Sequence, residues 1–136
     1  MTKLICISVL TLTLSACSAH NPFIVANTTD VKPAGTQHYP ARTGAVLVVE
    51  GPLPANVKYE LLGDIEIGKV WYGGSDKLWQ ELADRARAIG ADAVIEAKTW
   101  HQPSGYSWSA PHAHGQAVKI LNPEEIHDLS ALGKIL

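Results

Sequence analysis

The sequence predicts a small α+β domain, a β-β-α-β-β sandwich in which one helix packs on an antiparallel or mixed four-stranded sheet. Two kinds of pattern support this prediction: short β-branched runs bounded by glycine and proline, and a single stretch with a helical apolar period between them. The predicted domain covers residues 44–121, with a tether of residues 17–43 before it and a tail of residues 122–136 after it.

Two strands are predicted before the helix. Residues 45–49 form a short apolar run between Gly44 and Gly51, which is typical of a buried strand. In residues 57–70, apolar side chains occupy odd positions and charged side chains occupy even ones, as in a strand with one buried face. Gly63 interrupts this alternation and predicts a bend.

The helix is predicted from Ser75, which is placed to cap it, to Ile89. Its apolar residues recur three or four positions apart. They are Leu78, Leu82, Ala86 and Ile89. Glu81 and Arg85 are spaced as a favourable i,i+4 ion pair, and Gly90 is expected to end the helix in a left-handed conformation.

Two further strands are predicted at residues 93–100 and 107–121, joined by a turn at residues 103–105. Because proline cannot donate to a sheet, Pro111 predicts that the last strand lies at an edge, or pairs properly only from about His112. In the tail, Pro123 is expected to open a short helix. Its apolar side would carry Ile126, Leu129 and Leu132.

The N-terminal residues resemble the export signal of a bacterial lipoprotein. Lys3 precedes an apolar stretch from Leu4 to Leu14, which is shorter than the roughly 20 residues that a membrane-spanning helix needs. Leu14-Ser15-Ala16-Cys17 resembles a lipobox, in which the cysteine is lipidated after cleavage. Residues 1–16 are therefore predicted to be a signal peptide. Cys17 is predicted to carry the lipid anchor, whose acyl chains include palmitate. The alternative is an ordinary secretory signal with a chance cysteine.

The resemblance to lipoproteins also implies a location. An aspartate after the lipidated cysteine tends to hold such proteins in the inner membrane, whereas this chain has Ser18. We therefore expect the protein in the cell outer membrane, facing the periplasm. The tether is rich in turn-forming residues and would reach about 90 Å if fully extended.

Cysteine and charge exclude several functions. Cys6 leaves with the signal and Cys17 carries lipid, so the mature chain has no thiol for a disulfide or for catalysis. The full chain has 11 Lys and Arg against 13 Asp and Glu; loss of Lys3 leaves 10 against 13, a net charge of −3. This balance gives no electrostatic basis for binding nucleic acid.

Several segments resemble a known family. Tyr-Glu-Leu-Leu-Gly-Asp-Ile at residues 59–65, Gly-Ala-Asp-Ala-Val-Ile at residues 90–95 and Gly-Gln-Ala-Val at residues 115–118 look like the YbjQ family, which is also named heavy-metal-binding. Its β-β-α-β-β core is similar to that of RcsF-like envelope-stress lipoproteins. The resemblance covers about residues 44–121 and implies a role in envelope stress sensing. However, those sensors are stabilised by disulfides, which this chain lacks, and no cysteine motif supports metal binding.

An aromatic rim is predicted at one edge of the sheet. If the strands flanking the helix run parallel, their carboxyl ends meet beside the start of the helix, where ligands often bind in α/β sheets. The rim residues are Trp71, Tyr72, Trp100, Tyr106 and Trp108. They are candidates for ligand or partner contact; alternatively, they close the open end of the core.

Three histidines are candidate metal ligands. His112 and His114 are two residues apart and therefore share a strand face, and a hairpin that turns at Ser104-Gly105 could bring His101 opposite them. Three imidazoles suit zinc or copper. The alternative is that all three are solvated surface histidines.

The sequence contains no motif for nucleophilic, phosphoryl-transfer or paired-carboxylate chemistry, so no catalytic residue is assigned and an enzyme is not expected. Two functions stay open. The first is a non-enzymatic envelope lipoprotein that binds another envelope protein or its own copies. The second is a periplasmic module that binds a metal or a small ligand.

Overall fold

The computed structural model describes residues 27–126, 128 and 131–136. The predicted signal peptide, residues 1–16, and the predicted lipidation site Cys17 lie outside the described residues. Both stay predictions.

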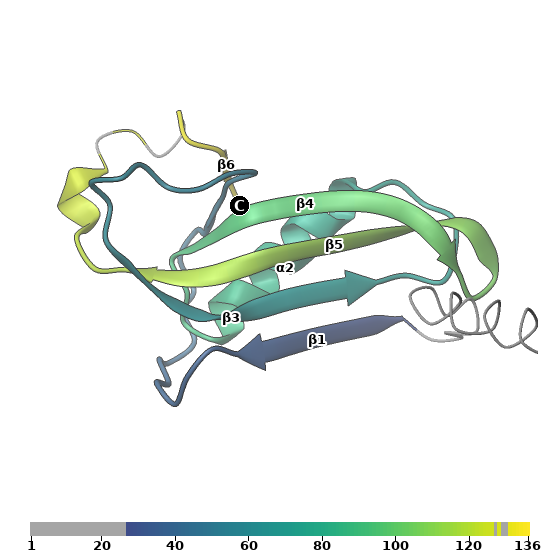
Figure 1. Ribbon diagram of the computed structural model, residues 1–136, viewed down its shortest axis with the longest axis horizontal. Helices are drawn as coiled ribbons and strands as arrows, with labels where there is room; N and C mark the ends of the chain where they lie inside the picture. The colour runs from purple at the N-terminus through teal and green to yellow at the C-terminus, as the bar shows by residue number, and fades with distance from the viewer. Residues whose placement is uncertain (1–26, 127, 129–130) are drawn as a thin grey trace, which may run out of the picture.

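The described chain forms one mixed sheet with a single α-helix on one face (Figure 1). The strands are β1 (Thr28–Pro33), β2 (Leu47–Val48), β3 (Tyr59–Gly68), β4 (Ala93–Ser104), β5 (Ser107–Ile120) and β6 (Lys134–Ile135). Their order across the sheet is β1-β3-β5-β4-β2-β6. The helix α2 spans Asp76–Ala88, and a short 3-10 turn, η1, spans Pro123–Glu125.

The two strands that flank α2 in the sequence are parallel. β3 and β4 both pair antiparallel with β5, which lies between them, so the condition on which the aromatic rim was predicted is met. The end of β3, the start of α2 and the β4–β5 hairpin therefore lie at one end of the sheet. Thr28 at the start of β1 pairs with Gly68, so β1 starts there too (Figure 1). We call this the near end; the far end is where β3 begins and β5 ends.

The helix covers one face of the sheet and closes the first core. Small side chains on β5 allow close packing, since a Cβ added at Gly115 would lie 2.4 Å from Val94 Cγ1. The core residues of α2 and of the sheet beneath it are Leu78, Leu82, Ala83, Ala86, Val48, Ile65, Ile67, Val94, Ala113 and Ala117. Their positions confirm the apolar stripe predicted for the helix.

A second core lies on the opposite face, at the far end. It is closed by the segment between β2 and β3, from which Leu53 and Val57 pack against the sheet. The other members are Leu47, Val49, Ala93, Ile95 and Val118. Toward the near end this face carries polar residues instead, among them Glu66, His112 and His114.

The predicted fold class is wrong. The five segments on which it rested occur in the predicted order, but the sheet has six strands rather than four. β1 lies within the stretch expected to be tether, and Arg42 in that stretch donates a backbone hydrogen bond to Arg87 O at 3.0 Å. Val31 is the one residue of β1 that is half-buried, and the others are exposed. The sequence of β1 therefore shows no alternation of apolar and polar side chains from which a strand could be predicted. β6 comprises two residues, too few to show any period.

The prediction of a C-terminal helix is also wrong for the residues that the structure describes. Only the 3-10 turn η1 forms, and Ile126 and Leu132 pack against the second core. Leu129 lies outside the described residues. In addition, β5 is a central strand, contrary to the edge position inferred from Pro111. Pairing with β3 does begin at His112, and Pro111 lies opposite His101 on β4.

Four local predictions, at Gly90, Gly63, Ser75 and Glu81, can be compared with the structure. Gly90 has a φ of +78°, as expected for the residue that ends the helix, and β3 has a register shift between Leu61 and Gly63. Ser75 precedes the helix but makes no side-chain capping hydrogen bond. Glu81 pairs with Lys69 across elements, at 2.7 Å, rather than with Arg85.

Candidate functional site

Four of the five predicted rim residues gather at the near end, and we call these four the aromatic tip. Trp71 and Tyr72 follow β3, while Tyr106 and Trp108 lie on the β4–β5 hairpin. The Trp71 and Tyr106 rings stack with centroids 5.0 Å apart, and Trp108 N donates to the Tyr72 hydroxyl at 3.4 Å. All four side chains are exposed, by 60%, 62%, 58% and 82% in chain order.

Backbone contacts hold the two parts of the tip together. Tyr106 N donates to Val70 O at 3.0 Å, which ties the hairpin to the segment after β3. His101 Nε2 lies 3.0 Å from Gly73 O and donates to it, so this histidine positions the Gly73-Gly74 loop. A hollow of about 460 Å³ beside the start of α2 is lined by Trp71 and Tyr72 and by the charged residues Lys69, Asp76 and Lys77.

Trp100 is separate from the tip. It is half-buried on β4, where its indole N–H donates to Gln102 Oε1 at 2.9 Å. Its ring stacks on His112, with centroids 5.7 Å apart. The structure therefore divides the predicted rim into an exposed aromatic tip and a half-buried Trp100–His112 pair.

The three predicted metal ligands do not converge. His112 and His114 share a face of β5 as expected, but His112 lies opposite Trp100 whereas His101 lies opposite Pro111, so His101 belongs to the other face. Within the described residues, no group of three or more His, Cys, Asp or Glu side chains could hold a metal ion. The register of the hairpin decides on which face of the sheet His101 lies. Because of Pro111, this register could not be determined from the sequence.

His112 is a buried histidine rather than a solvated one. Its side chain is only 6% exposed, and Nε2 has no hydrogen-bond partner among the described residues. Burial lowers the pKa of His112, His101 lowers it further, and Glu66 opposes the shift. His114 Nε2 lies 3.6 Å from Asp64 Oδ1, which is too long for a hydrogen bond.

A pocket at the far end is the feature that the sequence did not reveal. It has a volume of about 450 Å³, and we call it the far-end pocket. Its lining residues are Arg42, Ala45, Leu47, Asp92, Lys119, Ile120, Pro123, Ile126 and Ile135. They come from five separate segments of the chain, so no local pattern could have indicated the pocket.

Polar groups are concentrated on one carboxylate in the far-end pocket. Asp92 pairs with Arg42 and, at 3.1 Å, with Lys119 Nζ, and it accepts a hydrogen bond from Ile120 N at 3.0 Å. Two cations therefore share one anion. Burying a charge is costly unless it is paired, so this arrangement lets Asp92 be half-buried beside apolar side chains.

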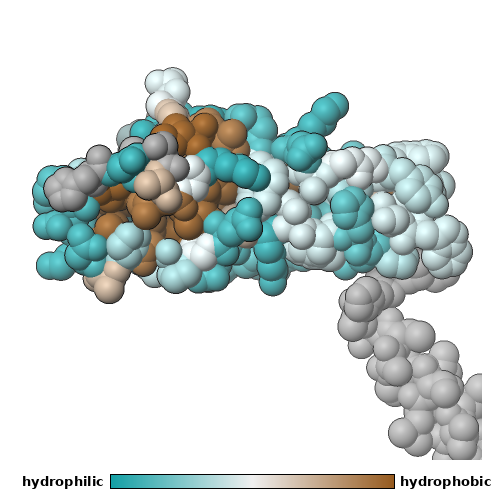
Figure 2. Space-filling model, turned by 90° about the horizontal axis from the view of Figure 1, so that it is seen from above, coloured by the Kyte–Doolittle hydropathy of each residue, from teal (hydrophilic) through white to brown (hydrophobic). Residues whose placement is uncertain are grey.

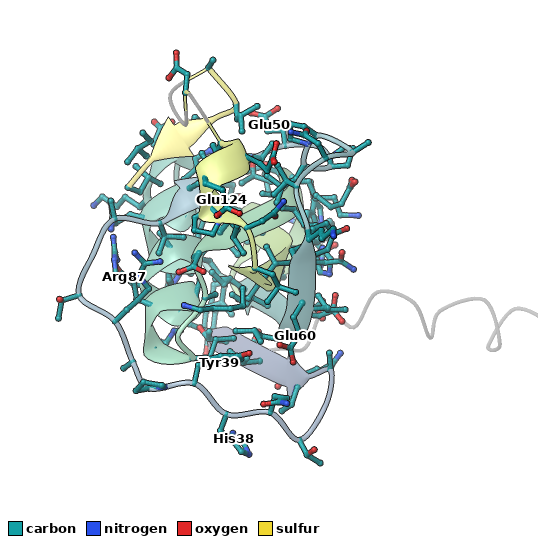
Figure 3. All side chains as sticks on the ribbon, turned by 90° about the vertical axis from the view of Figure 1, so that its left-hand side faces the viewer. His38, Tyr39, Glu50, Glu60, Arg87 and Glu124 are labelled. Atoms are coloured by element: carbon teal, nitrogen blue, oxygen red, sulfur yellow. The ribbon has the colours of Figure 1, made fainter. Side chains whose placement is uncertain are left out.

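The far end is held together by segments distant in sequence (Figure 3). The Tyr39 hydroxyl donates to Glu60 Oε2 at 2.7 Å, and this hydrogen bond to a carboxylate raises the pKa of Tyr39. Val46 and Leu136 exchange backbone hydrogen bonds of 2.7 and 3.0 Å, which fix β6 beside β2. The chain before β2 is thus part of the domain that forms the pocket.

Comparison with protein-family models, curated proteins and solved structures finds no match. The resemblance to the YbjQ family and to RcsF-like lipoproteins stays a prediction. Among the described residues, no helix is both long and apolar enough to cross a membrane.

Proposed function

We propose that this protein is a non-enzymatic lipoprotein of the cell envelope, anchored to the outer membrane through Cys17, whose domain binds another envelope protein. The anchor is inferred from residues 14–17. The observation that carries the binding role is the far-end pocket, because it is a concave apolar surface with a small polar cluster at one side.

The surroundings of the pocket favour a protein partner. Leu121 and Ile135 are exposed at this end, by 58% and 47%, and apolar surface gathers there (Figure 2). Interfaces concentrate their binding energy where an apolar side chain of the partner enters a pocket surrounded by polar groups. The paired Arg42, Asp92 and Lys119 provide such polar groups.

A photocrosslinking experiment tests this role. A benzoylphenylalanine placed at Ile135, in the pocket lining, is expected to give a discrete protein adduct in intact cells. Ala45 also lines the pocket and its side chain is exposed, so Ala45→Trp should fill the pocket and abolish the adduct. Ala55→Trp is the matched control, since Ala55 is exposed outside the pocket lining. An adduct that persists in Ala45→Trp would contradict the proposal, and an adduct of twice the chain mass would identify the partner as a second copy.

A small ligand is the second candidate, favoured by the two cations around Asp92. Their excess positive charge beside an apolar hollow of about 450 Å³ suits an amphiphile with an anionic head. Dodecanoate should then raise the melting temperature of the protein, whereas dodecanol should not, and Ala45→Trp should remove the effect. No shift with dodecanoate would rule this candidate out.

A further inference from the structure

We propose that the aromatic tip inserts into the interface of the membrane that holds Cys17, so that the near end of the domain lies on the lipid surface. This inference rests on the lipid anchor of the proposed function. It assigns the tip to lipid and leaves the far-end pocket for the partner.

The path of the chain places the tip close to the anchor. β1 begins at the near end, where Thr28 pairs with Gly68, and Asn27 Oδ1 accepts a hydrogen bond from Val70 N at 3.2 Å. Val70 directly precedes the tip residues Trp71 and Tyr72. Ten residue steps separate Cys17 from Asn27 (27 − 17), so the covalent chain limits their separation to about 35 Å. The near end is therefore the part of the domain to which the chain from Cys17 connects directly.

The composition of the tip suits a lipid interface. Residues 70–75 and 99–111, which contain its four aromatic side chains, include no Asp, Glu, Lys or Arg; the charged residues that border the tip are Lys69, Asp76 and Lys77, in the hollow beside α2. Charged side chains are costly to bring to the hydrocarbon boundary, whereas Trp and Tyr are enriched at the level of the headgroups because one end of each is apolar and the other polar. Trp71 and Tyr72 follow the end of β3, Tyr106 lies in the turn between β4 and β5, and Trp108 lies at the start of β5.

The exposure of the tip is otherwise unexplained. Four aromatic side chains that are 58–82% exposed contribute little to the core, and Trp71 and Tyr106 stack on each other instead. An envelope protein could also cover such a surface, since Trp and Tyr are common in interfaces. The short chain to Cys17 favours lipid, because it keeps this end of the domain within reach of the membrane.

Fluorescence quenching by brominated lipids tests the proposal on the full chain. The protein is purified from membranes, the acyl chains on Cys17 are verified by mass spectrometry, and the sample is reconstituted into vesicles of phosphatidylethanolamine and phosphatidylglycerol with brominated acyl chains. Two reciprocal variants separate the tryptophans. W71F/W108F retains emission only from Trp79 and Trp100, which are half-buried rather than exposed, whereas W79F/W100F retains only the tip emission.

We expect brominated vesicles to quench W79F/W100F strongly and to leave W71F/W108F nearly unchanged, relative to vesicles without bromine. Equal quenching of both variants, or none, with lipid present on Cys17 would overturn the proposal and leave the pocket function standing. Absence of lipid on Cys17 would overturn both. No quenching, together with a protein adduct from a photocrosslinker at Trp108 in cells, would assign the tip to a protein partner.

Discussion

Gly90 shows how a single residue fixes the turn from helix to sheet. Its φ of +78° is in the left-handed region, and a Cβ there would lie 2.5 Å from Tyr39 Cβ and 2.7 Å from Pro40 O. The position thus requires glycine both for its backbone conformation and because the segment before β2 passes against it.

Gly90→Ala should therefore lower the free energy of unfolding by about 2 kcal/mol or more, combining the cost of a left-handed alanine with that of overpacking. Gly35→Ala is the control, because a Cβ at Gly35 would meet nothing within 4 Å. Urea unfolding of the two variants measures the difference. Equal stabilities would show that residues 39–40 do not pack where the structure places them.

His112 makes the stability of the domain depend on pH. Burial holds its pKa below the ordinary value of 6.5, so the unfolded chain takes up a proton more readily than the folded one. The stabilisation from this residue is complete above about pH 6.5 and is lost as the pH falls through and below that value.

His112→Phe should reduce the loss of melting temperature between pH 7.5 and pH 5, since phenylalanine retains a ring against Trp100 and does not titrate. His38→Gln, at an exposed histidine, is the control and should leave the pH profile unchanged. A profile that is equally steep in His112→Phe and in the unaltered protein would contradict a buried neutral His112.

Among the elements, β1 differs most from the prediction, because the sequence placed its residues in a tether. Its register with β3 runs from Thr28 opposite Gly68 to Pro33 opposite Gly63. Val31 lies opposite Ile65 and packs against the first core, whereas the Lys32 side chain is 65% exposed in surface ion pairs. Substitutions at the neighbouring residues Val31 and Lys32 are therefore expected to differ in their effect on the free energy of unfolding.

Val31→Ser should cost about 1 kcal/mol of unfolding free energy, because it removes half-buried apolar area. Lys32→Ser should change it by less than about 0.5 kcal/mol, as is usual for exposed ion pairs. If residues 28–33 were a tether, as the sequence predicted, both substitutions would be neutral. Chemical denaturation of the two variants separates these outcomes.

Sequence patterns predicted the elements that have a buried face and missed the others. The helix and the strands from Tyr59, Ala93 and Ser107 each show a period of apolar residues, and these elements formed. β1 and β6 are edge strands with little buried area, so their positions depend on tertiary pairing. The aromatic tip could be predicted from the order and direction of the strands. The far-end pocket could not, because it depends on contacts such as that of Arg42 with Asp92, 50 residues apart, which no local pattern contains.

At the scale of the whole molecule, the domain has two ends with different surfaces. The near end carries four exposed aromatic side chains, and residues 70–75 and 99–111, which contain them, include no charged residue. The far end carries the apolar pocket with its shared carboxylate. Nine residue steps along β3, from Tyr59 to Gly68 (68 − 59), separate the ends by about 30 Å.

The connection between Cys17 and the domain is therefore shorter than the tether of residues 17–43 that the sequence predicted. Because the chain is in the sheet from Thr28, ten residue steps rather than the whole of residues 17–43 lie between Cys17 and the start of the described structure at Asn27. With its near end on the membrane, the domain would point the far-end pocket away from the lipid. A partner would then bind at the end farthest from the anchor.

The most direct test compares one position at each end in intact cells. Tyr106 in the tip and Leu121 at the far end are equally exposed, at 58%, so a benzoylphenylalanine at either site should react with whatever lies nearest. We expect a phospholipid adduct from position 106 and no lipid adduct from position 121. A lipid adduct at position 121 with none at position 106 would show that the domain has the opposite orientation.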